Sequence, residues 1–155
     1  MKLIIGFVLT LFMASQALAN KPLVGLRAGV ILVKSKHSVE KTIDNLEAIL
    51  KEKGITVVTR WKHQNGAKKA GLKLRPTELI IFGNPMVGSH FFTSQQSAGL
   101  DLPQRALAFE DEKKQTWLIY NDPKFIAQRH GIKNRKKIIK KMTRGLKKMT
   151  TKACN

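Results

Sequence analysis

The spacing of apolar residues changes several times along this 155-residue chain, and these changes limit the folds it can form. Apolar residues recur every three or four positions between 39 and 50, after Ser38 and before Gly54, which predicts an amphipathic helix. Alternating or continuous apolar runs predict strands at residues 26–33, 55–61, 79–82, 106–109 and 116–120. This order favours an α+β domain, with helices packed on a largely antiparallel sheet.

Two of the predicted strands end in an Asn or Asp directly before a Pro. Asn84 precedes Pro85, and Asp122 precedes Pro123. An Asn or Asp at the N-cap followed by Pro at the first helical position is typical of a helix start. The second pair therefore predicts a helix over residues 123–130, and the first predicts a helix or a loop. A further short helix or turn is expected at residues 67–72.

The first 19 residues have the features of a cleaved export signal. Lys2 gives a positive start, the apolar stretch after it is short for a membrane anchor, and residues 17–19 form a small-x-small cleavage pattern. We therefore expect an exported, periplasmic protein with one domain over residues 20–132 and a tail at residues 133–155. A retained membrane helix is the alternative.

Basic residues gather at the C-terminal end of a chain whose formal net charge is +19. Residues 133–155 contain no Asp or Glu, and their apolar residues have helical spacing, which predicts an amphipathic helix with a basic outer face. Anionic lipid or an anionic envelope polymer is the partner expected for residues 133–152. Nucleic acid is a disfavoured partner unless the leader is retained and the protein stays in the cytosol. The simpler alternative is a solvated helix that binds no partner.

Residues that carry chemistry form few recognisable patterns. The four His residues lack metal-ligand spacing, and no Gly-x-Ser-x-Gly motif is present, so neither a metal site nor a serine hydrolase is predicted. The segment from Gly83 to Gly88 offers an anion site if its backbone N–H groups are free, although a capped turn is the simpler interpretation. Cys154, the single cysteine, either pairs with another chain or stays a free thiol.

Four motifs in order resemble the bacterial and archaeal family called domain of unknown function 302. They are LRPTELIIFGNP at residues 74–85, AGLDLP at 98–103, YNDP at 120–123 and RHG at 129–131. His63 matches a His common in that family, whereas Ser89 stands where the family usually has Thr. The resemblance covers roughly residues 25–132. It implies a curved antiparallel sheet of the TATA-box-binding-protein-like class and a homodimer, but no reaction or cofactor.

Five polar residues form the predicted ligand site, because they lie at strand ends or turns where side chains can converge on one rim of the sheet. They are His63, Asn84, Asp101, Asn121 and Asp122. We expect a binding or accessory protein for an unidentified small ligand. The alternative is an enzyme in which His63 acts as general base beside Asp101.

Overall fold

The computed structural model describes residues 28–155, so the predicted export signal lies outside the described residues. The elements are β1 (Val30–Lys34), α1 (Val39–Glu52), β2 (Thr56–Lys62), α2 (His63–Lys69), β3 (Thr77–Gly83), α3 (Pro85–Phe92), the 3₁₀ helix η1 (Gln96–Leu100), β4 (Gln104–Glu110), β5 (Thr116–Asn121), α4 (Pro123–Arg129) and α5 (Lys136–Cys154). The predicted helix after Ser38 and all five predicted strands are present.

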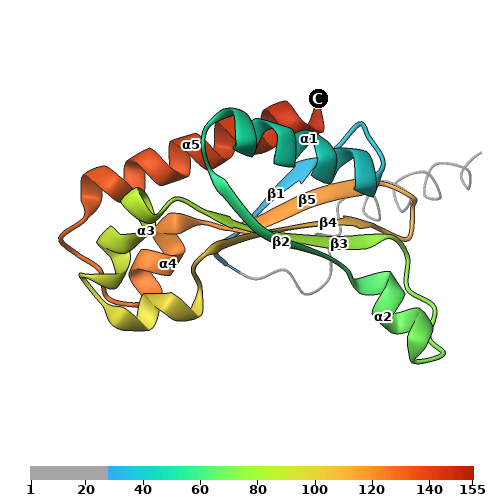
Figure 1. Cartoon of the computed structure of the whole chain (residues 1–155), viewed down its shortest axis with the longest axis horizontal. Coiled ribbons are helices and arrows are strands. Elements are labelled where there is room, and N and C mark those ends of the chain that lie inside the picture. The colour runs from blue at the N-terminus through green and yellow to red at the C-terminus, as the bar shows by residue number, and fades with distance from the viewer. Residues whose placement is uncertain (1–27) are drawn as a thin grey trace, which may run out of the picture.

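The five strands form one sheet in the order β1-β5-β4-β3-β2, and every neighbouring pair is antiparallel. Helices α1 and α5 lie side by side across one face of this sheet (Figure 1). Alternate strand residues such as Ile80 and Leu118 point toward these helices and are fully buried. The predicted α+β fold, with helices packed on one face of an antiparallel sheet, is confirmed.

Helix α1 forms where the local signals predict it. The hydroxyl of Ser38 accepts a hydrogen bond from the backbone N–H of Lys41 at 3.2 Å, which caps the first turn. Ile43 and Leu46 lie on the buried face, and the chain leaves the helix at Gly54, where φ is +63°. The amphipathic pattern therefore sets both the bounds of the helix and the side that faces the sheet.

Helix α5 is part of the domain core, so the domain does not end at residue 132. Its residues Leu146, Met149 and Cys154 belong to the same buried cluster as Ile43 of α1. The helix is amphipathic with a basic outer face, as the sequence predicts, but its apolar side packs against α1 and β1. Residues 133–155 are therefore an integral element and not an appended tail.

The two ends of the sheet differ. Helices α3, η1 and α4 gather where β3 and β5 end, around a second apolar cluster that includes Phe91 and Ile126. At the opposite end α2 projects away from the sheet, and it has no buried residue (Figure 1). Helix α2 starts at His63, directly after β2, and not at residue 67. Within residues 28–155, no helix is both long and apolar enough to cross a membrane.

Apolar side chains also form a row on the sheet face that points away from α1 and α5. The strand register places them opposite one another in the order Leu32, Ile119, Leu107, Leu79 and Trp61, so the row crosses all five strands. The two ends of the row are exposed, Leu32 by 39% and Trp61 by 59%.

Candidate functional site

His63 lies apart from the other four residues of the predicted ligand site. It follows Lys62, which pairs with Glu78 at the start of β3, whereas Asn84 follows the far end of β3. Asp101 lies near Asn84, because Asp101 comes shortly before β4 and the start of β4 pairs with the end of β3. A seven-residue strand is about 20 Å long. The pairing of His63 with Asp101 as a general base was therefore wrong, since the length of the sheet separates them.

Three of the remaining predicted residues hold the fold in place. The side chain of Asn84 accepts a hydrogen bond from the N–H of Met86 at 2.9 Å, and Asp122 accepts one from the N–H of Lys124 at 2.9 Å. Both residues are thus the helix N-caps that the Asx-Pro order predicts. Asn121 contributes its backbone carbonyl, which accepts a hydrogen bond from another side chain.

The turn from Gly83 to Gly88 is capped, so it does not offer the anion site considered above. The N–H groups of Val87 and Gly88 donate to the carbonyl of Asn84 at 2.9 and 2.8 Å. Because the N–H of Met86 is also bonded, the first turn of α3 has no vacant donors at these three positions. The simpler interpretation of this segment, a capped turn, is the correct one.

Asp101 belongs to a polar cluster that joins η1 to the end of α4. Both of its oxygens accept hydrogen bonds from Arg129 at 3.0 and 3.1 Å, and Oδ2 lies 2.8 Å from Nε2 of His130. The other ring nitrogen of His130 lies 3.0 Å from the hydroxyl of Ser97. Sequence reasoning missed this pairing, although both partners fall in motifs that carried the family resemblance.

The residue types in this cluster are those of a nucleophile, a base and an acid, but the surroundings favour a structural role. Ser97 lies on the exposed surface of η1, and neither Ser97, His130 nor Asp101 lines the apolar cavity described below. The carboxylate of Asp101 is held on two sides and is only 9% exposed. We interpret the cluster as a set of polar contacts that holds η1 and α4 together.

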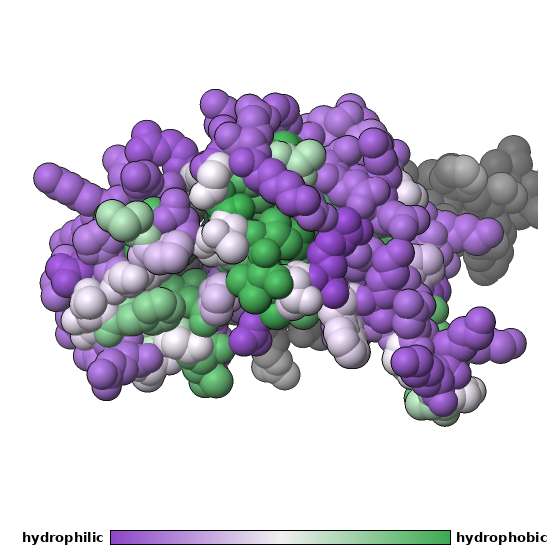
Figure 2. Space-filling view, viewed as in Figure 1, coloured by the Kyte–Doolittle hydropathy of each residue, from purple (hydrophilic) through white to green (hydrophobic). Residues whose placement is uncertain are grey.

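A cavity of about 670 Å³ lies between α3, α5 and the adjoining ends of β2, β3 and β4. Its volume is within the range of small-molecule sites. Most of its lining is apolar, and the buried residues among the lining are Phe82, Leu102, Gln104, Leu146 and Met149. Figure 2 shows an apolar patch in this region below α5, bordered by hydrophilic side chains. We call this cavity the α3–α5 pocket.

The polar groups of the α3–α5 pocket are few, and its charged groups are all basic. Lys53, Lys141 and Lys148 are exposed and line the pocket, and no Asp or Glu is among the described lining residues. Gln104 donates from Nε2 to the carbonyl of Asn121 at 2.8 Å, and its buried Oε1 has no hydrogen-bond partner in the described part of the chain. Of the five predicted ligand residues, only Asn84 lines this pocket.

Gly145 of α5 keeps one side of the α3–α5 pocket open. A Cβ atom built at this position would meet no atom within 4 Å, and Gly145 is a lining residue. Glycine inside a helix costs about 1 kcal/mol relative to alanine, so its presence here is not explained by helix stability. A larger side chain at this position would occupy the pocket.

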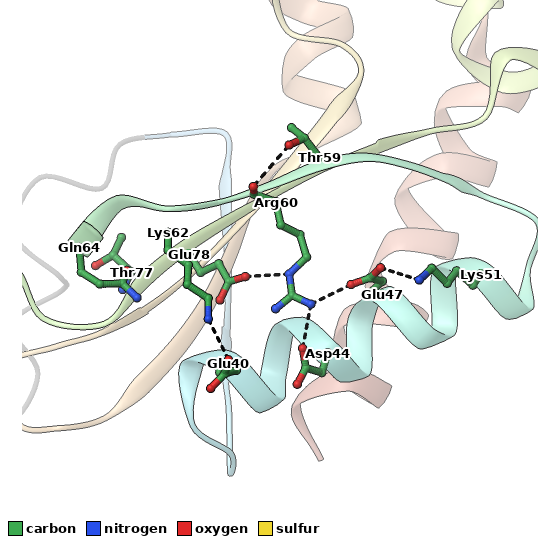
Figure 3. A network of polar contacts seen from close by, with 10 residues as sticks. All are labelled: Glu40, Asp44, Glu47, Lys51, Thr59, Arg60, Lys62, Gln64, Thr77 and Glu78. Carbon is green, nitrogen blue, oxygen red and sulfur yellow. Dashed lines mark hydrogen bonds and ion pairs between the residues drawn. The ribbon is translucent and has the colours of Figure 1, made fainter. Parts of the chain in front are cut away.

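A second, polar cavity lies at the opposite end of the sheet, where Arg60 of β2 binds three carboxylates (Figure 3). Its guanidinium lies 2.7 Å from Glu78, 2.8 Å from Asp44 and 2.8 Å from Glu47. The hydrogen bond from Lys51, together with that from Arg60, holds the pKa of Glu47 below its usual value. The ion pairs of this network join α1 to the edge of the sheet.

Within residues 28–155, no group of three or more His, Cys, Asp or Glu side chains is arranged to hold a metal ion. The fold and its pockets thus define a small α+β domain whose clearest ligand-sized cavity is apolar with a basic rim. The chain belongs to the family described as "Domain of unknown function DUF302", whose model matches residues 31–149. The resemblance found in the sequence motifs is confirmed, and the match extends beyond residue 132 into α5.

Three curated relatives share a stretch of 105 residues at 50% identity, which is 68% of this chain. Two are named "Fluoride-specific ion channel FluC 1", from Brucella suis and Brucella abortus, and one "Fluoride-specific ion channel FluC 2", from Brucella melitensis. The stretch is 41% of the first relative and 39% of the other two, so the chain spans less than half the length of these proteins.

A solved structure has the same fold. It is described as the crystal structure of an uncharacterized conserved protein DUF302 from Bacillus stearothermophilus, and it matches with a TM-score of 0.74. The match covers 83% of this chain and 100% of the other, at 18% sequence identity. At this identity the likeness establishes the fold alone.

Proposed function

We propose that this chain is an exported, periplasmic binding or accessory protein that holds a small apolar ligand in the α3–α5 pocket. The observation that carries the proposal is a cavity of about 670 Å³ with a mainly apolar lining. Apolar surface that stays in contact with water is unfavourable by about 25 cal/mol per Å². A ligand that covers the lining therefore gains affinity without a specific polar partner.

The test is binding of the uncharged fluorescent probe N-phenyl-1-naphthylamine to the mature chain and to two glycine variants. Gly145→Leu places a side chain in the pocket, whereas Gly66→Leu places the same side chain on α2, where an added Cβ likewise meets no atom within 4 Å. We expect saturable binding to the parent and to Gly66→Leu, and at least tenfold weaker binding to Gly145→Leu. Equal binding to all three proteins, or no binding to the parent, would overturn the proposal.

A second function is favoured by the outer side of α5. Lys137, Lys140, Arg144 and Lys147 form an exposed stripe at helical spacing, and α5 contains no acidic residue. We propose that this outer stripe binds an anionic envelope surface, since each basic residue near such a surface contributes about 1 kcal/mol. The relatives support a place near a membrane, because the matching stretch in them is part of a longer protein named as an ion channel.

Charge substitution tests this second function better than deletion, because α5 contributes to the core. Changing all four residues of the outer stripe to Gln should abolish co-sedimentation with vesicles that contain phosphatidylglycerol. The matched control removes four exposed charges elsewhere, at Lys36, Lys68, Lys69 and Lys73. Equal pelleting of the two variants would contradict the assignment to α5.

We also propose that a second copy of the chain covers the apolar row on the sheet face that points away from α1 and α5. Leu32 and Trp61, at the two ends of the row, are exposed, so a charged residue can replace each of them without disturbing the core. The double variant Leu32→Glu and Trp61→Glu should sediment as a monomer, whereas the parent sediments as a dimer. A parent that is monomeric at micromolar concentration, or a variant that still dimerises, would refute this contact.

A further inference from the structure

The basic rim of the α3–α5 pocket specifies the kind of ligand it takes. We infer that the ligand is a single-chain amphiphile whose apolar tail enters the pocket and whose anionic head stays at Lys53, Lys141 and Lys148. This inference rests on the proposed binding function and adds the chemical class of the ligand.

The three rim lysines have no carboxylate partner among the described residues, in contrast to Lys51 and Lys152. Lys51 binds Glu47, and Lys152 lies 3.6 Å from Glu52. The chain has only 10 acidic residues against 29 Lys and Arg, and the acids near α1 are already engaged by other bases. The rim therefore presents positive charge that nothing in the described part of the chain neutralises.

The spacing of the rim residues on α5 leaves an opening between two of them. Lys141, Gly145 and Lys148 are four and three residues apart, so they lie on one face of the helix. Gly145 has no side chain, and a Cβ there would meet open space. An apolar tail can thus pass the helix at Gly145 while its head remains between the two lysines.

The pocket interior excludes the reverse orientation. Phe82, Leu146 and Met149 are buried lining residues, and a charged head among them would lose its hydration without an opposite charge as compensation. A head at the rim keeps its contact with water and also faces the lysines. A cationic head would meet like charge in the same place, so the rim discriminates between ligands by the sign of the head group.

The experiment measures displacement of N-phenyl-1-naphthylamine from the mature chain by two single-chain amphiphiles with similar alkyl tails and opposite head-group charges. We expect dodecanoate to displace the probe at about tenfold lower concentration than dodecyltrimethylammonium, both below their micelle concentrations. The rim variant Lys141→Gln with Lys148→Gln should weaken dodecanoate about tenfold more than it weakens the uncharged probe. The control, Lys140→Gln with Lys147→Gln, removes the same charge from the part of the outer stripe that lies away from the rim, and it should change the dodecanoate affinity less than twofold.

Two results would overturn the inference while the proposed function stands. One is equal displacement by the two head groups, and the other is an equal loss of dodecanoate affinity in the rim variant and its control, each with the uncharged probe still bound. If the parent fails to bind the uncharged probe at all, the binding function and the ligand class are both wrong.

Discussion

Arg60 of β2 and Glu78 of β3 form an ion pair in which the carboxylate is almost completely buried. Nε of Arg60 lies 2.7 Å from Oε1 of Glu78, whose side chain is 1% exposed. The same guanidinium reaches Asp44 and Glu47 of α1, so one side chain joins the edge of the sheet to the helix above it (Figure 3).

Replacing Arg60 with Met should destabilise the domain strongly, because Glu78 would keep its buried charge without a partner. Loss of one member of a buried pair typically lowers the free energy of unfolding by about 3 kcal/mol or more. Urea unfolding measures the change. The matched control is Lys62→Met, which removes an exposed ion pair with Glu40 and should leave the urea midpoint almost unchanged. Equal effects of the two substitutions would contradict the role given to Arg60.

Asp101→Asn should reduce stability but leave ligand binding intact. The substitution weakens the contacts with Arg129 and His130, and the loss of a charged hydrogen-bond acceptor at a part-buried site costs about 1–3 kcal/mol. Thermal unfolding and probe binding are measured on the same sample. Lost binding at unchanged stability would place the functional site in this cluster and not in the α3–α5 pocket.

Cys154 should be unreactive in the folded protein. It is fully buried and unpaired, and burial raises the pKa of its thiol to about 11. At pH 8 a disulfide reagent should therefore modify the thiol in denaturant and not in buffer. Rapid modification of the native chain would show that the end of α5 opens.

The same raised pKa predicts how stability varies with pH. The thiol ionises in the unfolded chain near its ordinary pKa of about 8.5, and in the folded chain only near pH 11. Between these values the folded state binds more protons, so the free energy of unfolding should fall as pH rises. In Cys154→Ala this part of the pH dependence should vanish. A parent and a variant with parallel stability curves from pH 8.5 to 11 would contradict the prediction.

The features that the sequence predicts correctly depend on residues close together in the chain. Ser38, Asn84 and Asp122 each cap a helix within three residues of their own position. The strands and the long helix α1 likewise follow from local periodicity. The order of these local patterns favours the α+β class, and the family motifs point to the same fold.

The features that the sequence does not predict depend on which strand ends lie next to one another in the folded sheet. The position of His63 follows from the direction of β2 in the sheet, which a strand pattern does not contain. The α3–α5 pocket combines residues that are far apart in the chain, from Lys53 to Met149. Gly145 contributes to it because the absence of a side chain leaves space there, which a sequence pattern does not reveal. The sequence prediction places α5 outside the domain, because its many basic residues indicate a solvated tail. The four-three spacing of its apolar residues indicates the buried side that the structure shows.

The central claim is that a ligand enters the α3–α5 pocket, and the methionine methyl groups test it directly. Met142 and Met149 line the pocket, whereas Met86 is 81% exposed and does not. Methyl NMR of the protein, with the three signals assigned by substitution, follows them during a dodecanoate titration. We predict saturable shifts for Met142 and Met149 and an unmoved Met86 signal. Shifts confined to Met86, or no shift at the two pocket methyls, would contradict the claim.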